Sequence, residues 1–268
     1  MKKSFLLSFF ALIVLSLTAF SFVSWNRTHT VRVPMQDPGK DSVCRKDLSY
    51  FLGPVLEPEM FFDVSTRFNA TVSKDKLHQA ASILDIIPTE GTQGLENFHT
   101  VSVSVIRNGK DVTENGHGDA LNAAQLELLR TVDHSTNIHI NSLCMQRNPN
   151  TGELQNYDVV YYITVTPQKQ AQYLGGREAL IDLLKTGIAG KTYVIASDKL
   201  ESGQINFTVS AKGTVEHVRL ASSCGYATID EALLEQVRNM PLRWTPATDA
   251  SEKAVDQELV FFFGTQGC

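Results

Sequence analysis

The alternation of apolar and polar residues is clearest in the last quarter of the chain, where it predicts a β-hairpin. Residues 205–210 (INFTVS) alternate with a period of two, as a half-buried strand does. Residues 211–213 end in Gly213, which can adopt the positive φ of a tight turn. Residues 215–220 then alternate again and predict the returning strand.

A helix and a final strand are predicted after this hairpin. Apolar residues recur at helical spacing over 229–240, and Thr228 or Asp230 is expected to cap the helix at its start. Pro241 is expected to end it. The last predicted strand is 257–264 (QELVFFFG), whose two faces are both apolar.

The middle of the chain shows both periods as well, so an α+β fold class is expected. The predicted strands are 61–72, 101–106, 137–145 and 157–166, the predicted helices are 73–87, 121–132 and 170–187, and the predicted loop is 108–119. We therefore expect an α+β sandwich domain of no recognised family at 60–168, followed by a small C-terminal domain with an antiparallel sheet at 169–268.

The N-terminus predicts export. Lys2 and Lys3 precede a run without charge that extends to Trp25. Its length favours an uncleaved inner-membrane anchor with a periplasmic body, because a spanning helix needs about 20 apolar residues. Small residues at 19 and 21 leave a cleaved signal and a periplasmic protein as the alternative. We expect 1–25 to be this anchor or signal segment and 26–59 to be a linker.

Composition narrows the class of protein. The 268 residues are 43% hydrophobic and 20% charged, which is typical of a folded body. The net charge of −5 argues against nucleic acid as a partner, because phosphate binding needs a basic surface.

The C-terminal pattern resembles the TonB C-terminal domain family, the periplasmic domain of bacterial energy transducers. The resemblance covers about the last hundred residues, with weaker similarity at its upstream end. The positions that match the family pattern most distinctively are Gly213, Gly225, Asp230, Pro241, Trp244 and Pro246.

The resemblance implies protein partners, namely an outer-membrane transporter and the proton-channel motor, and a role in transport through the envelope. Two features depart from it. The segment 26–59 is too short and too poor in proline for the family's spacer, and 5–25 has no membrane histidine. A scaffold or interaction protein of the envelope that reuses the module without energy transduction is therefore the alternative.

The last strand is the predicted partner-binding element. Chain direction predicts that it pairs with strand 205–210 at one edge of the sheet, where unpaired N–H and C=O groups could receive a partner strand. The alternative is an ordinary core strand that neighbouring structure covers. The predicted edge residues are Gln257, Glu258, Leu259, Val260, Phe261, Phe262 and Phe263.

Four cysteines in an exported chain favour disulfides. The predicted path of the C-terminal strands brings Cys224 and Cys268 to the same end of the sheet, so we predict that pair and Cys44–Cys144 as the other. A reactive Cys224 beside a helix start is the weaker interpretation.

No motif predicts catalysis. A nucleophile elbow is absent, as is a glycine-rich phosphate loop with a following lysine. His117, Asp133, His134 and His139 lie near one another in sequence but lack the spacing of a zinc motif. We expect no enzyme activity, no cofactor and no metal site.

Overall fold

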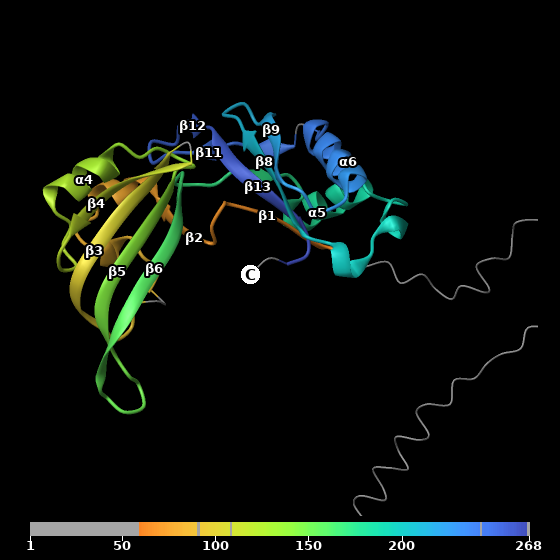
Figure 1. Ribbon diagram of the computed structural model, residues 1–268. Coiled ribbons are helices and arrows are strands. Elements are labelled where there is room, and N and C mark those ends of the chain that lie inside the picture. The colour runs from red at the N-terminus through yellow and green to blue at the C-terminus, as the bar shows by residue number, and fades with distance from the viewer. Residues whose placement is uncertain (1–58, 90–91, 108, 242, 267–268) are drawn as a thin grey trace, which may run out of the picture. The chain divides into compact units, whose positions relative to one another are not determined.

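The computed structural model describes residues 59–89, 92–107, 109–241 and 243–266. The predicted segment 1–25, and all of the predicted linker 26–59 except Glu59, lie outside these residues. The described residues form a mixed α+β fold that is mostly sheet, with four α-helices and largely antiparallel strands (Figure 1).

One sheet is built from the predicted C-terminal strands and one unexpected strand. Its order is β1 (Phe61–Ser65), β13 (Gln257–Gly264), β8 (Ser202–Val209) and β9 (Val215–Ser222), and all neighbours are antiparallel. In Figure 1, β13 runs between the orange β1 and β8. The predicted hairpin, β8 and β9, is confirmed. The predicted pairing of the last strand, β13, with the first strand of that hairpin, β8, is also confirmed.

Two helices cover one face of this sheet, α5 (Gly176–Thr186) and α6 (Ala227–Arg238). Their apolar stripes meet the inward residues of β8 and β13, because alternate strand residues point to the same face. Residues buried in this core include Leu184, Ile205, Phe207, Leu233, Phe261 and Phe263.

The predicted start of α5 and the caps of α6 are wrong. Residues 172–173 form the short strand β7 (Gln172–Tyr173), which pairs with β10 (Trp244–Thr245), and the helix begins only after Gly175 at φ 100°. Strands β11 (Ala247–Thr248) and β12 (Ala254–Val255) form a second short ribbon. Helix α6 has Tyr226 at its N-cap without a side-chain cap, so neither Thr228 nor Asp230 caps it.

The second large sheet has five strands in the order β2, β6, β5, β3, β4. Its elements are β2 (Ala70–Ser73), β3 (Leu95–Arg107), β4 (Lys110–Gly116), β5 (Asn137–Arg147) and β6 (Leu154–Thr166), with only β2 and β6 parallel. Helices α3 (Lys74–Gln79) and α4 (Ala123–Arg130) pack on its apolar face through Leu77 and Leu129.

Three predicted elements of the middle segment are wrong. The predicted strand 61–72 is two strands, β1 and β2, which belong to different sheets. The predicted helix 73–87 ends at Gln79 and is followed by a single 3₁₀ turn, Ile83–Asp85. The predicted loop 108–119 contains β4, an outer strand whose exposed side chains need not be apolar.

Candidate partner-binding edge of the four-stranded sheet

The predicted position of the last strand at the sheet edge is wrong. Strand β13 has β8 on one side over its whole length and β1 on the other side over Val260–Gly264. Phe261 and Phe263 are fully buried, and Val260 on the opposite face is 1% exposed. The strand is therefore an internal core strand, although Phe262, on the same face as Val260, is only half-buried.

The backbone donors of β13 that point away from β8 already have partners. The Glu258 N–H donates to Ser135 Oγ at 2.8 Å, on the side away from β8. N–H groups alternate in direction along an antiparallel strand, so those of Val260, Phe262 and Gly264 point toward β1. A partner strand could reach β13 from this side only by displacing β1.

Strand β1 is one edge of this sheet among the described strands. The N–H groups of β13 that point toward β1 lie opposite Phe61, Asp63 and Ser65. Backbone groups alternate in direction along a strand, so the N–H and C=O groups of Phe62 and Val64 point outward. Sequence reasoning missed this edge because the strand is short and pairs with a segment almost two hundred residues away. The alternation in FFDVS was the available signal, but it cannot identify a distant partner.

Strand β9 is the other edge, and it has features that discourage strand addition. Its register with β8 shifts twice, and His217 adopts a left-handed φ of 51° in one of these bulges. Glu216, His217 and Arg219 are exposed along it. Bulges and charged residues are the usual protection of an edge strand, so β1 is the more open edge.

Residues of β1 line three hollows. Phe62 lines a hollow of about 290 Å³, together with Met60 and Lys185. Val64 lines a larger cleft of about 640 Å³, whose walls include Leu174, Leu180 and Trp244. On the opposite face, a hollow of about 600 Å³ is lined by residues that include Phe61, Asp63, Arg67 and Phe262. Both faces of the edge strand are therefore flanked by recesses.

The two glycines of the family pattern have structural roles. Gly213 lies at φ 77° in the β8–β9 turn, and a Cβ there would lie 2.6 Å from the carbonyl oxygen of Trp244. Gly225 lies at φ 89°, with the Lys199 carbonyl oxygen 2.8 Å from where a Cβ would be. Both positions need glycine for the backbone conformation and for close approach.

Of the other four positions of the pattern, Asp230 and Trp244 make buried contacts. Asp230 is 4% exposed and accepts hydrogen bonds from Ser223 Oγ at 2.5 Å and from the Cys224 N–H at 3.0 Å. Trp244 is buried between Tyr173 and Phe207. Pro241 follows Met240 just after α6, and Pro246 lies between β10 and β11. None of the six positions lies on β1.

The two cysteines that the structure describes, Cys144 and Cys224, are buried. Among the described residues, Cys144 and Cys224 form no disulfide, but their predicted partners Cys44 and Cys268 lie outside these residues, so both predicted disulfides stay predictions. Desolvation raises the pKa of the Cys224 thiol to about 12, and burial also raises the pKa of Cys144. A Cβ at Gly264 would lie 3.3 Å from Cys224 Cβ, so the end of β13 reaches this cysteine.

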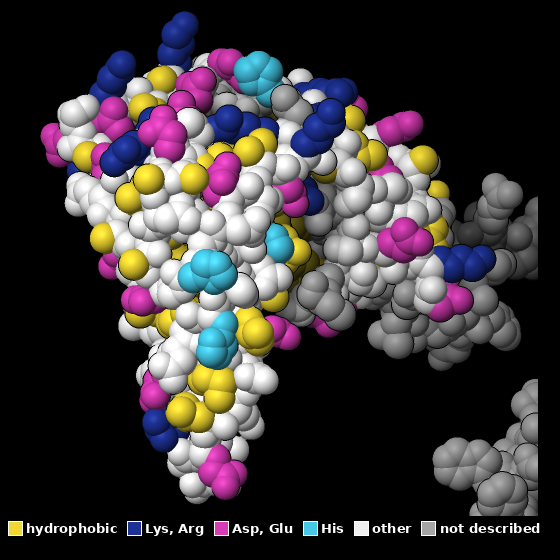
Figure 2. Space-filling view, turned by 60° about the vertical axis from the view of Figure 1, so that its left-hand side comes forward, with side chains coloured by type: hydrophobic (Ala, Val, Ile, Leu, Met, Phe, Trp, Pro, Cys, Tyr) yellow, Lys and Arg dark blue, Asp and Glu magenta, His cyan; other side chains and the backbone are white. Residues whose placement is uncertain are grey.

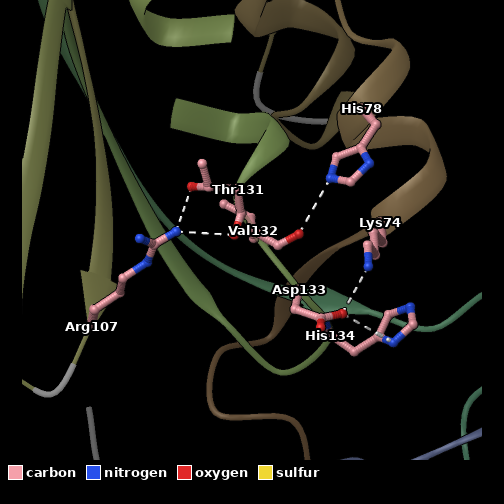
Figure 3. Close-up of polar contacts among 7 residues, drawn as sticks. All are labelled: Lys74, His78, Arg107, Thr131, Val132, Asp133 and His134. Atoms are coloured by element: carbon pink, nitrogen blue, oxygen red, sulfur yellow. Dashed lines mark hydrogen bonds and ion pairs between the residues drawn. The ribbon is translucent and has the colours of Figure 1, made fainter. Parts of the chain in front are cut away.

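Two of the four residues considered for a metal site, Asp133 and His134, belong to a small polar cluster. Lys74 Nζ lies 2.8 Å from Asp133 Oδ1, and His134 Nδ1 lies 3.6 Å from the same oxygen (Figure 3). The Lys74 hydrogen bond, followed by the His134 backbone N–H, lowers the pKa of Asp133. His78 Nε2 lies 3.3 Å from the Val132 carbonyl oxygen.

These contacts join both ends of α3 to the segment after α4. His139 lies elsewhere, stacked on Tyr162 at 4.4 Å. The described residues contain no group of three or more His, Cys, Asp or Glu side chains placed to hold a metal ion.

Charge and hydropathy give two further observations. On the face in Figure 2, Lys and Arg side chains are interspersed with Asp and Glu side chains. Within the described part of the chain, no helix combines the length and apolar character needed to cross a membrane.

Comparison with known proteins gave no match. No family model matches the chain, and neither a curated protein nor a solved structure is significantly similar to it.

Proposed function

We propose that this chain is a cell-envelope protein that binds protein partners through its C-terminal TonB-like module. The proposal includes an N-terminal anchor or signal at 1–25, a linker, a middle α+β domain, and a C-terminal domain completed by β1. The observation that carries it is the short edge strand β1, whose outer backbone groups are left without a strand neighbour among the described elements. Strand addition to such an edge is a common way to bind an extended segment of another protein.

The proposed docking strand is β1 instead of β13. The side of β13 away from β8 is filled by β1 and Ser135, whereas β1 offers the N–H and C=O groups of Phe62 and Val64. Hollows beside both residues can receive alternate side chains of an added strand. We propose binding, without catalysis, as the role of this surface.

Two functions share this binding mode. In the first, the partner is an outer-membrane transporter and the chain takes part in transport with a proton-channel motor. In the second, the chain is an envelope scaffold that makes protein contacts without energy transduction. The second is favoured by the lack of a histidine in 5–25, because a polar group within a membrane segment is the usual sign of coupling.

The proposal is tested by photo-cross-linking in cells. A photoreactive phenylalanine analogue replaces Phe61 on β1 in one variant and Glu216 on β9 in another. The cross-linked products of both variants are identified by mass spectrometry. We expect envelope-protein adducts from position 61 in clear excess over position 216. Equal adducts at the two edges, or none at position 61, would reject β1 as the docking strand.

Cells that lack a working proton motor separate the two functions. Adducts at position 61 that disappear in these cells favour the transport function, and adducts that persist favour the scaffold.

A further inference from the structure

We infer that the hollow of about 600 Å³ beside Phe61 and Asp63 binds a small monocarboxylate that carries an aromatic ring. The site is built from side chains, whereas the proposed function uses the outward backbone groups of Phe62 and Val64. The inference therefore goes beyond the proposed function and does not depend on it. It is carried by the construction of the hollow, its unbalanced charge and its half-buried phenylalanines.

A row of side chains across three strands lines one side of the hollow. Asp63 of β1, Phe262 of β13 and Gln204 of β8 are neighbours in the register, so their side chains point to the same face. Helices α5 and α6 cover the other face of this sheet. Residues 67–69, between β1 and β2, add a wall. The volume lies within the range of small-molecule sites, about 300–1,000 Å³.

The charged residues that line the hollow do not balance. They are Asp63, Arg67 and Arg177. Arg177 is paired with Asp63, because its Nε and Nη2 lie 3.0 and 2.6 Å from Asp63 Oδ1. Arg67 is not among the ion-paired residues of the described part of the chain. One positive charge is therefore left, and a ligand with one negative charge would neutralise it.

Arg67 is positioned to receive a carboxylate. Its Nη1 donates to Gln204 Oε1 at 3.3 Å, and its guanidinium carbon lies 5.9 Å from the centre of the Phe68 ring. A guanidinium presents its N–H groups as a planar fork that matches both oxygens of a carboxylate. A phosphate monoester fits the charge less well, because it carries about −1.5 to −2 charges near pH 7 and Asp63 would repel the surplus.

Three phenylalanines give the hollow its apolar surface. Phe61, Phe68 and Phe262 line it, and all three are half-buried. The Phe68 ring is supported from outside the hollow by Tyr162, with 5.2 Å between the ring centres. Half-exposed rings can pack against a further ring in offset or edge-to-face geometry. The hollow therefore suits a ligand with a carboxylate at one end and an aromatic ring at the other.

The test is a calorimetric titration of the full-length chain in detergent, with detergent alone as the blank. The probes are phenylacetate, its neutral analogue phenylacetamide, acetate, which lacks the ring, and phenyl phosphate. Phenylacetate should bind at least about tenfold more tightly than phenylacetamide or acetate, and its binding should weaken as salt rises. Equal affinity for phenylacetate and phenylacetamide, tighter binding of phenyl phosphate, or no binding of phenylacetate would overturn the inference.

Variants of opposite sign locate the site. Arg67→Gln should weaken phenylacetate binding at least about tenfold. Asp63→Asn removes the opposing carboxylate and releases Arg177, so it should tighten binding by several fold, and loss of an exposed ion pair costs little stability. Lys212→Gln, at the β8–β9 turn, is the matched control and should leave binding unchanged.

Thermal unfolding is measured for each variant to show that it is folded. A structural defect would weaken binding in both Arg67→Gln and Asp63→Asn, whereas the inference requires opposite effects. Equal affinities of Arg67→Gln and Lys212→Gln would overturn a site at this hollow.

The outcomes separate this inference from the proposed function. If position 61 cross-links to a partner in cells while phenylacetate does not bind, the inference fails and docking at β1 stands. If phenylacetate binds with the expected variant effects and position 61 gives no adduct, the inference stands and docking at β1 is rejected.

Discussion

Gly213 shows at the scale of one residue how the module is held together. Its φ of 77° lies in the left-handed region, and the Trp244 carbonyl oxygen leaves no room for a side chain. Trp244 in turn packs against Tyr173 and Phe207. The β8–β9 turn and the segment after α6 can therefore approach this closely only because Gly213 has no Cβ.

Gly213→Ala should destabilise the protein for two reasons, a strained φ and a clash with backbone. Gly118→Ala is the matched control, because Gly118 has a similar φ of 75° but nothing within 4 Å of its would-be Cβ. We expect Gly213→Ala to lower the free energy of unfolding by about 2–4 kcal/mol, and Gly118→Ala by about 1 kcal/mol. Urea denaturation measures both, and equal losses would show that the Trp244 contact contributes nothing.

Cys224 makes a second prediction at this scale. Burial raises its pKa from 9.0 to about 12, so in the reduced protein its thiolate fraction near pH 8 is about a thousandfold smaller than that of an exposed thiol. Iodoacetamide should leave Cys224 unmodified in the reduced native chain and modify it rapidly in urea. Rapid modification in the native state would contradict the burial of this thiol.

The same shift links Cys224 to stability at high pH. The folded-state pKa lies above the unfolded-state value, so the neutral thiol favours the folded state below about pH 9. This contribution is lost as the pH rises from 9 toward 12, because the unfolded chain then ionises first.

At the scale of elements, the spacing of apolar residues predicted those strands and helices that have one face against a core. Strands β8, β9, β5 and β6 and helix α4 match the predicted periods, because each has one face against a core. Strand β4 was missed because its sequence, KDVTENG, is almost entirely exposed and polar.

The docking edge could not be predicted because it depends on a long-range pairing. The apolar faces of 257–264 fit both an edge strand and a core strand, and only the pairing with β1 decides between them. The pattern in 61–65 predicts a strand but carries no information about its neighbour. Deleting β13, a natural test of the edge hypothesis, would remove buried Phe261 and Phe263 and unfold the core.

At the scale of the whole molecule, the proposed binding strand lies within the described residues, whereas the parts that would couple binding to energy are expected upstream of them. The described residues provide a sheet with one open edge, and the resemblance to transducers covers only the C-terminal region. The sequence upstream does not provide the coupling parts, because the predicted linker 26–59 is short and 5–25 contains no histidine. The central claim therefore concerns β1 as a docking strand and is independent of the energy source.

Amide hydrogen exchange on the full chain tests this claim most directly, with and without the partner that cross-links at position 61. The account predicts that the partner slows exchange of the Phe62 and Val64 amides, while the Val260 and Phe262 amides, which pair with β1, stay as slow as before. Faster exchange at Phe61, Asp63 and Ser65, with Phe62 and Val64 unprotected, would mean that the partner displaces β1 and pairs with β13, and it would contradict the account.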